Sequence, residues 1–110
     1  MFSRRMIYEP LRSIDSATFT GSYQALGTPL ANPASLVKLV NNSTVLVTVS
    51  VDGTTDVDVA PASSFFLYDV TSDSPHESES VYYEKGRQYY VKGSAGTGSV
   101  YLVVQYARQI

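Results

Sequence analysis

The segment 45–59 constrains the fold most, because valines alternate with small polar residues on both sides of an Asp52-Gly53 turn signal. Period-two alternation indicates strands, and Asp-Gly between two strands indicates a tight hairpin. A two-residue loop would set carboxylates among the valines. A three-residue loop over 51–53 avoids this and gives Gly53 the left-handed position, where a residue without Cβ is favoured. We therefore predict the three-residue loop, which pairs Ser50 with Thr54, Val47 with Val57 and Val45 with Val59.

This register gives the hairpin two different faces, because side chains alternate along a strand. One face is all valine and is the predicted piece of core. The other face is mostly polar and is predicted to point to solvent or to a partner. It carries Leu46, Thr48, Ser50, Asp56 and Asp58.

Similar alternation along the rest of the chain predicts about eight strands in all. Their spacing of roughly 8–12 residues is typical of an all-β sandwich or barrel. We favour a two-sheet antiparallel sandwich, jelly-roll-like, over a closed barrel. The other strands are expected at 18–26, 35–41, 64–70, 81–84, 88–93 and 99–108, with a tight hairpin turn at Lys85-Gly86 and a glycine-rich hairpin turn at 93–98.

Two of these strands are apolar on both faces. In 64–70, Phe65 and Leu67 alternate with Phe66 and Tyr68, and 99–108 is apolar in the same way. A strand of this kind lies in the interior of a sheet, or one of its faces is covered by a partner.

With 110 residues the chain is expected to form one domain, over 16–110, preceded by an extended N-terminal arm over 1–15. The arm shows no strand alternation, and Pro10 interrupts any helix. It is either a frayed terminus or a segment that orders against a neighbouring subunit. In the second case its apolar anchors are Phe2, Met6, Ile7, Tyr8 and Leu11.

Composition excludes several classes of site and partner. The chain has no cysteine, so it can form neither a disulfide nor a thiolate metal site. It shows no apolar run typical of a signal peptide or a transmembrane helix, so we expect synthesis in the cytoplasm and no membrane partner. Its basic residues are few and scattered, so we expect no nucleic-acid partner.

Charge is distributed unevenly along the chain. Residues 39–84 hold eight acidic residues and no Lys or Arg, whereas 85–110 hold four basic residues and no acid. These charges are either solvated independently or complementary between subunits in a ring or stack. In the second case the candidate contacts join Asp56 and Asp58 of one subunit to Arg87 and Lys92 of the next.

No pattern in the sequence indicates a reaction centre. Asp52, Asp56 and Asp58 do not have the spacing of an EF-hand calcium loop. His76 is the sole histidine, and no nucleophile elbow accompanies it. The glycines of 93–98 join two predicted strands, whereas a phosphate-binding loop opens a helix. We therefore expect no catalytic residue, no cofactor and no metal site, and a protein that is not an enzyme.

Tyrosine is unusually frequent, with nine tyrosines and no tryptophan. Tyrosine is enriched at protein interfaces and also lines sugar-binding surfaces. The doublets Tyr82-Tyr83 and Tyr89-Tyr90 place an aromatic ring on each face of a strand, which makes Tyr82 and Tyr90 candidates for contact. Two functions stay open: subunit–subunit contact in an assembly, or a carbohydrate-binding or adhesion module.

Four stretches resemble small β-sandwich virion structural proteins of tailed bacteriophages. They are Asn41-Asn42-Ser43-Thr44 leading into 49–53, then 67–72, 83–93 and 96–102. The resemblance implies a structural subunit of the virion, either a capsid cement or decoration protein or a component of the head–tail neck. It implies as partners further copies of this chain, in a homo-oligomer, and other virion proteins such as major capsid or portal and neck proteins.

Overall fold

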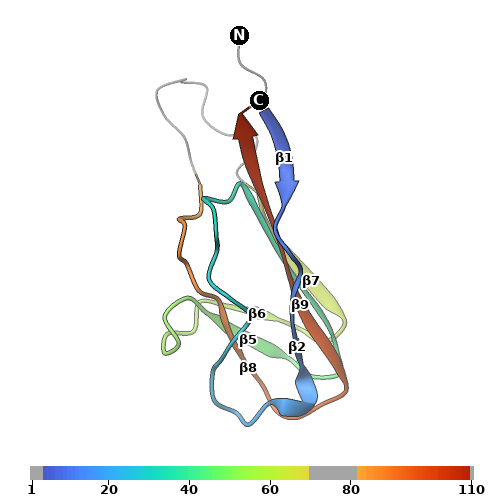
Figure 1. Ribbon diagram of the computed structural model, residues 1–110. Helices are drawn as coiled ribbons and strands as arrows, with labels where there is room; N and C mark the ends of the chain where they lie inside the picture. The colour runs from blue at the N-terminus through green and yellow to red at the C-terminus, as the bar shows by residue number, and fades with distance from the viewer. Residues whose placement is uncertain (1–3, 70–81, 110) are drawn as a thin grey trace.

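The computed structural model describes residues 4–69 and 82–109, and it shows a sandwich of two antiparallel β-sheets, as predicted (Figure 1). The five-stranded sheet has the order β1-β9-β4-β7, with β2 also paired to β9. Its strands are β1 (Arg4–Tyr8), β2 (Arg12–Asp15), β4 (Leu36–Ser43), β7 (Ser64–Asp69) and β9 (Gly98–Gln109). The four-stranded sheet has the order β3 (Gln24–Ala25), β8 (Tyr90–Lys92), β5 (Val47–Ser50) and β6 (Asp58–Ala60).

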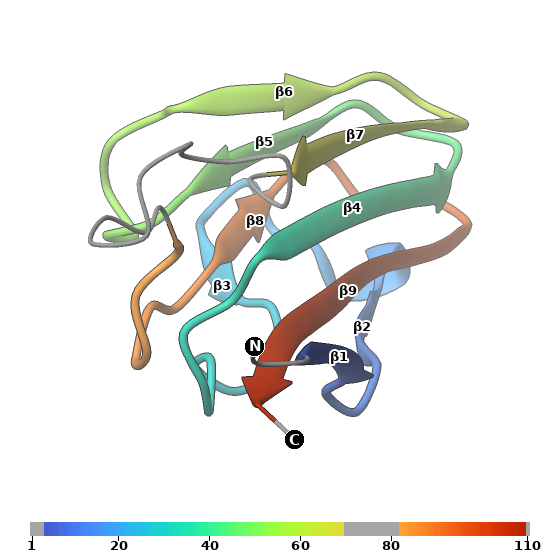
Figure 2. The same ribbon diagram turned by 90° about the horizontal axis from the view of Figure 1, so that it is seen from above.

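The core lies between the two sheets and is formed by alternate residues of their strands. From β4 and β9 it receives Val37, Leu39 and Leu102, and from the other sheet Val49 and Val91, all fully buried. Strand β9 lies between β4 and the pair β1 and β2, so the prediction that this two-faced strand occupies the middle of a sheet is confirmed (Figure 2).

The predicted register of the hairpin in 45–59 is wrong. Val47 lies opposite Ala60 and Val49 opposite Asp58, so the loop is longer than three residues. The shift exchanges the faces of the second strand. Val57 and Val59 are 53% and 50% exposed, whereas Asp58 is half-buried.

Two polar side chains explain the longer loop. The Ser50 hydroxyl accepts hydrogen bonds from the backbone N–H groups of Asp52 and Gly53, at 3.1 and 2.9 Å, and donates to Asp52 Oδ1 at 2.8 Å. Asp52 Oδ1 also accepts from the N–H groups of Thr54 and Thr55, at 2.8 and 2.7 Å. These bonds satisfy the loop backbone locally and so compete with strand pairing. Gly53 does adopt the predicted left-handed conformation, with φ of 84°.

The inward position of Asp58 is stabilised by a residue distant in the sequence. The hydroxyl of Tyr68, on β7 of the opposite sheet, donates a hydrogen bond to Asp58 Oδ2. This bond joins the two sheets and gives the half-buried carboxylate the partner that burial requires.

The prediction that residues 1–15 contain no strand is wrong. β1 and β2 both pair with β9, with Tyr8 opposite Gln105 and Arg12 opposite Leu102. The three residues between the two strands face only two residues of β9, which forms a bulge and breaks the alternation in the sequence. The division into an arm over 1–15 and a domain over 16–110 stays a prediction.

Three further local predictions need correction. In 18–26 only Gln24–Ala25 is a strand, and a 3₁₀ turn at Ser16–Thr18 precedes it. The turn at Lys85-Gly86 forms, but it does not close a hairpin, because Tyr83 pairs with Ala34 and β8 pairs with β3 and β5. The segment 93–98 crosses from one sheet to the other instead of forming a hairpin turn, since β8 and β9 belong to different sheets.

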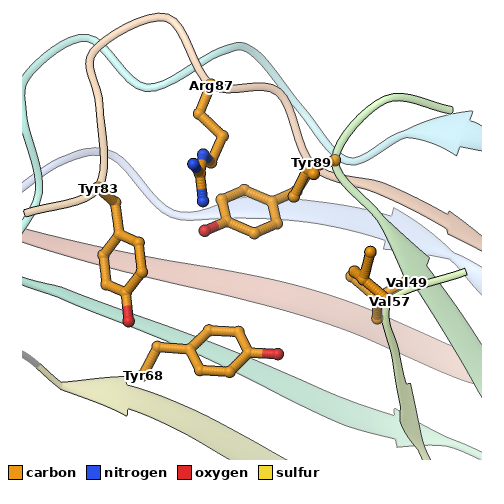
Figure 3. A pocket seen from close by; sticks show the side chains of 7 residues that line it. Val49, Val57, Tyr68, Tyr83, Arg87 and Tyr89 are labelled. Atoms are coloured by element: carbon orange, nitrogen blue, oxygen red, sulfur yellow. The ribbon is translucent and has the colours of Figure 1, made fainter. Parts of the chain in front are cut away.

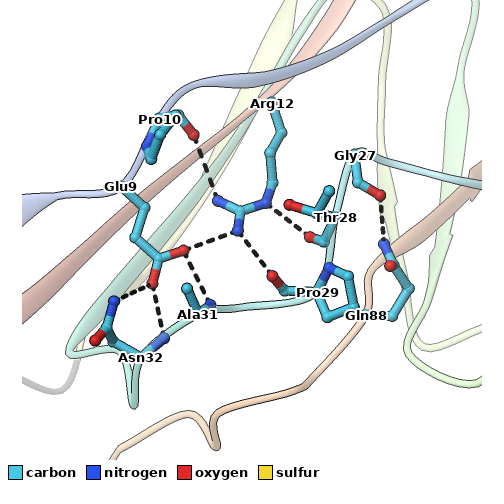
Figure 4. A network of polar contacts seen from close by, with 9 residues as sticks. All are labelled: Glu9, Pro10, Arg12, Gly27, Thr28, Pro29, Ala31, Asn32 and Gln88. Carbon is cyan, nitrogen blue, oxygen red and sulfur yellow. Dashed lines mark hydrogen bonds and ion pairs between the residues drawn. The ribbon is translucent and has the colours of Figure 1, made fainter.

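A buried ion pair fixes the loop after β3 to the edge of the five-stranded sheet (Figure 4). Glu9 and Arg12 are 6% and 7% exposed, and Arg12 Nη2 donates to Glu9 Oε1 at 2.8 Å. Arg12 also donates to the carbonyls of Thr28 and Pro29, at 2.8 and 2.9 Å. Both charges therefore have the hydrogen-bond partners that burial requires.

Candidate functional site

The outer face of the five-stranded sheet, the side turned away from the core, is the first candidate. On β7 it presents Phe65 and Leu67, which are 65% and 47% exposed. Their partners on β4 are Val40 and Lys38, which in turn face Tyr101 and Val103 on β9. We use the term outer face for Tyr8, Leu36, Lys38, Val40, Phe65, Leu67, Asp69, Tyr101, Val103 and Gln105.

The outer face is apolar across its width. Tyr8, on β1, lies opposite Gln105 and is 66% exposed, which extends the apolar surface to the far side of β9. Its charged members are Lys38, near the centre, and Asp69, at the end of β7 opposite Leu36. Extended apolar surfaces with a polar border mark sites of interaction in soluble proteins. This surface can therefore bury aromatic and aliphatic area against another protein.

A pocket between the two sheets is the second candidate (Figure 3). It has a volume of about 260 Å³ and is lined by Val49, Val51, Val57, Tyr68, Tyr83, Arg87 and Tyr89. The rings of Tyr68 and Tyr83 have centroids 6.0 Å apart, and the Arg87 guanidinium carbon lies 5.8 Å from the Tyr83 centroid.

The pocket is neutral at its walls and cationic at its rim. Burial raises the pKa of the Tyr68, Tyr83 and Tyr89 hydroxyls, and the hydrogen bond to Asp58 raises that of Tyr68 further. The three hydroxyls are thus protonated at neutral pH. Arg87 pairs with Glu84 only loosely, at 3.8 Å and near solvent. The pocket can therefore hold an apolar or sugar-like ring and offer a positive charge beside it.

Several predicted contact residues are paired within one subunit, on the other sheet. Lys92 Nζ lies 3.3 Å from Asp56 Oδ1 and 4.6 Å from the centroid of the Tyr23 ring. The Tyr23 hydroxyl donates to Asp56 Oδ1, which lowers the pKa of Asp56. Burial and the Asp56 carboxylate together raise the pKa of Tyr23 to about 12. The charges of Asp56 and Lys92 therefore already have partners without a neighbouring subunit.

The remaining predicted contact residues lie apart from one another. Tyr82 is exposed, Tyr90 is half-buried and lies over Gly53, and Ile7 is half-buried on β1. Leu11, between β1 and β2, is exposed. Phe2 and His76 lie outside the described residues.

Phe65, Leu67 and Val103 were not among the predicted contact residues, although the sequence contains a signal for them. Their strands are apolar on both faces, and one explanation offered for that pattern was a face covered by a partner. β7 is the last strand of its sheet, so an interior position is wrong for this strand. The explanation left for Phe65 and Leu67 is a face covered by a partner.

Within residues 4–69 and 82–109, no group of three or more His, Asp or Glu side chains is arranged to hold a metal ion. The same residues contain no helix long and apolar enough to cross a membrane.

No protein-family model matches the chain, and no curated protein matches it. Its fold has a likeness to the crystal structure of the Dit protein (gp 19.1) of phage SPP1, described as a paradigm of the hub adsorption apparatus in phages that infect Gram-positive bacteria. The match has 14% sequence identity and a TM-score of 0.42, and it covers 94% of this chain and 49% of the Dit chain. The chain therefore spans about half the length of that structure.

Proposed function

We propose that this chain is a non-enzymatic structural subunit of a bacteriophage particle, whose outer face is buried against another virion protein of the capsid or the head–tail neck. The observation that carries the proposal is the exposed apolar outer face, with Phe65, Leu67 and Tyr8 at its most exposed points. The phage context is supported by the sequence resemblance in residues 41–44, 49–53, 67–72, 83–93 and 96–102.

The energetics of such a contact favour assembly. Full burial of a large apolar side chain contributes about 1.5–3 kcal/mol, and the outer face offers several such side chains in one layer. The buried centre of a protein interface is apolar and poor in charge, which matches this surface, whose charged side chains are Lys38 and, at the end of β7, Asp69.

The test uses phage particles assembled without this chain and the purified protein added back. We expect the wild-type protein to co-sediment with the particles and Val103→Glu to remain in the supernatant. Val103 lies in the middle of the outer face and opposite Lys38, so the introduced carboxylate gains an ion pair that helps to preserve the fold. Circular dichroism checks that the variant is folded.

Leu46→Glu is the matched control, because Leu46 is also exposed and apolar but does not belong to the outer face. We expect it to bind like the wild type. A folded Val103→Glu protein that still binds would refute the role of the outer face. A wild-type protein that binds neither capsids nor necks would refute the virion function.

A second candidate function, carbohydrate binding, is favoured by the pocket of Figure 3. Tyrosine rings stack on sugar faces, and Arg87 could pair with an acidic sugar. A glycan array probed with the wild-type protein tests this function. Carbohydrate binding in the pocket requires a glycan that the wild-type protein binds and Tyr83→Ala does not. Tyr101→Ala, which alters the outer face and not the pocket, should still bind this glycan. The predicted contact residues are tested in the same way by Tyr82→Ala and Tyr90→Ala.

A further inference from the structure

We infer that the free edge of β7 pairs in antiparallel orientation with β7 of a second copy, so that two five-stranded sheets become one continuous sheet across a two-fold axis. The inference rests on the proposed function and deepens it, because it names a second copy of this chain as a partner. It is carried by three features of β7: its edge position, the absence of charge and proline in its first five residues, and its self-complementary sequence.

β7 is an edge strand with a regular backbone. All six of its residues pair in one uninterrupted register with β4, from Leu36 opposite Asp69 to Asn41 opposite Ser64. In the part of the chain that the structure describes, no strand pairs with its other side. An edge of this kind presents unpaired backbone groups that can serve as a template for another strand.

Proteins normally protect such edges with charge, proline, a bulge or a short length. The other strands at sheet edges among the described residues follow this rule. β3 and β6 have two and three residues, β1 begins with two arginines and ends at a bulge, and β2 has four residues, the first and last of which are Arg12 and Asp15. The segment 64–68, in contrast, contains neither a charged residue nor proline, and Phe65 and Leu67 on it are exposed.

The sequence of β7 is complementary to itself in one antiparallel register. A two-fold axis perpendicular to the sheet keeps both outer faces on the same side, so outward residues must meet outward residues. Placing Phe66 on the axis pairs Phe65 with Leu67 of the second copy, twice, and Ser64 with Tyr68. Asp69 then lies beyond the ladder. The register centred on Leu67 instead sets Asp69 against Phe65, which is unfavourable.

The pairing also extends the apolar surface. Both outer faces lie on one side of the joined sheet, so the dimer presents an apolar layer of double width to the particle. A ladder of five residues from each copy is small beside a standard interface of about 1,600 Å². We therefore expect a reversible dimer that dissociates on dilution.

Light scattering over a dilution series tests the dimer. We expect the mass of the wild-type protein to rise toward twice 12.0 kDa with concentration, and that of Leu67→Glu to stay at 12.0 kDa. The introduced carboxylate faces Lys38 within the subunit, which favours the fold, but it faces Phe65 of the second copy in the dimer. Leu46→Glu is the control and is expected to dimerise. A wild-type protein that is monomeric at every concentration would overturn the inference.

Disulfide trapping tests the register, because the chain has no cysteine of its own. Opposite residues of antiparallel strands have Cα atoms about 4.5–5.5 Å apart, which lies within the range of a disulfide. We expect an oxidised mixture of Phe65→Cys and Leu67→Cys to form a cross-linked dimer, and each variant alone to form far less. Equal cross-linking in the mixture and in either variant alone would contradict the pairing.

The two proposals fail in different ways. A dimer that does not bind particles would leave the β7 pairing intact and refute the virion function. A strictly monomeric protein that binds particles through its outer face would refute the β7 pairing and leave the virion function intact.

Discussion

At the scale of single residues, the buried pair Glu9 and Arg12 is expected to tolerate substitution poorly. Besides the contact with Arg12, Glu9 Oε2 accepts from the backbone N–H and the side-chain amide of Asn32, at 2.9 and 3.0 Å. A buried ion pair adds little net stability compared with apolar residues of the same shape. Removing one partner, however, leaves an uncompensated charge in the interior.

Glu9→Ala is therefore expected to lower the free energy of unfolding by about 3–5 kcal/mol, because Arg12 is left buried without its counter-ion. Urea denaturation followed by circular dichroism measures the loss. Glu84→Ala is the control, since it removes an exposed ion pair with Arg87, and is expected to cost at most about 1 kcal/mol. Equal effects of the two substitutions would contradict the structural role of Glu9.

Stability is expected to fall in acid, partly through Glu9. Burial alone would raise the pKa of Glu9, but hydrogen bonds from Asn32, Arg12 and Ala31 outweigh it, and the pKa is lowered from 4.5. A lowered folded-state pKa stabilises the protein above the unfolded value, and this contribution is lost as pH falls through the folded-state pKa.

We therefore expect the difference in unfolding free energy between the wild type and Glu9→Gln to be large at about pH 7 and smaller at about pH 3. Urea denaturation at the two pH values measures this difference. A constant or widening difference in acid would show that Glu9 is not held ionised by its partners.

At the scale of elements, the joints between the two sheets depend on a few polar and glycine positions. Asn41 on β4 is fully buried, and its amide donates to the carbonyls of Val45 and Ala60 at 2.9 Å each, and of Pro61 at 3.1 Å. One side chain therefore holds the ends of β4, β5 and β6 together.

Asn41→Leu is expected to destabilise the fold by at least about 2 kcal/mol, because each buried carbonyl left unpaired costs about 1–3 kcal/mol. Asn42→Leu is the matched control: the neighbouring residue is exposed, and its substitution should cost much less. Thermal denaturation of the two variants side by side is the measurement. A smaller loss in Asn41→Leu than in Asn42→Leu would show that these bonds contribute nothing net.

The crossover between the sheets depends on Gly98. Its φ is +95°, and a Cβ there would lie 2.2 Å from the carbonyl oxygen of Asn42, whereas at Gly86, with φ of +90°, a Cβ would meet nothing within 4 Å. Gly86→Ala should therefore cost only about 1–2 kcal/mol for its left-handed backbone. Gly98→Ala should cost about 1–3 kcal/mol more, because the backbone must shift. Urea midpoints that are equal for the two variants would contradict the close approach.

At the scale of the whole molecule, the two sheets present different outer surfaces. The five-stranded sheet exposes an apolar layer that spans its strands, whereas on the side of the four-stranded sheet the exposed Val57 and Val59 lie near Asp56 and Lys92, which are paired with each other. Contacts between subunits are therefore expected to depend on apolar burial and strand pairing more than on complementary charge.

Salt distinguishes these two kinds of contact. Self-association is expected to persist in about 1 M NaCl, where the Debye length is about 3 Å and contacts between exposed charges are screened. Asp56→Asn removes a charge but keeps an acceptor for Tyr23, and it should leave the dimer unchanged. Sedimentation equilibrium at low and high salt is the measurement. Dissociation by salt would indicate that contacts between acidic and basic segments hold the subunits together.

Local pattern was enough to predict part of the candidate site. The two-faced apolar strands around Phe65 and Val103 were recognisable from their residues alone. Alternation does not encode strand order. It therefore could not show that β9 lies inside its sheet and β7 at the edge. The partners of Asp56 and Asp58 were missed for a similar reason, because Lys92, Tyr23 and Tyr68 are distant from them in the sequence.

The sequence by itself determined the fold class. Period-two alternation is a local property that gives each strand one apolar face, and sheets bury such faces by packing against each other. The sequence also determined the left-handed turn at Gly53, since that requirement concerns a single residue. Only the tertiary structure decided the register of 45–59. The local hydrogen bonds of Ser50 and Asp52 lengthen the loop. The hydrogen bond from the Tyr68 hydroxyl, on the opposite sheet, stabilises Asp58 in its inward position. A three-residue shift in register exchanges the two faces of the second strand and costs little locally, so contacts between distant residues select the face that is buried.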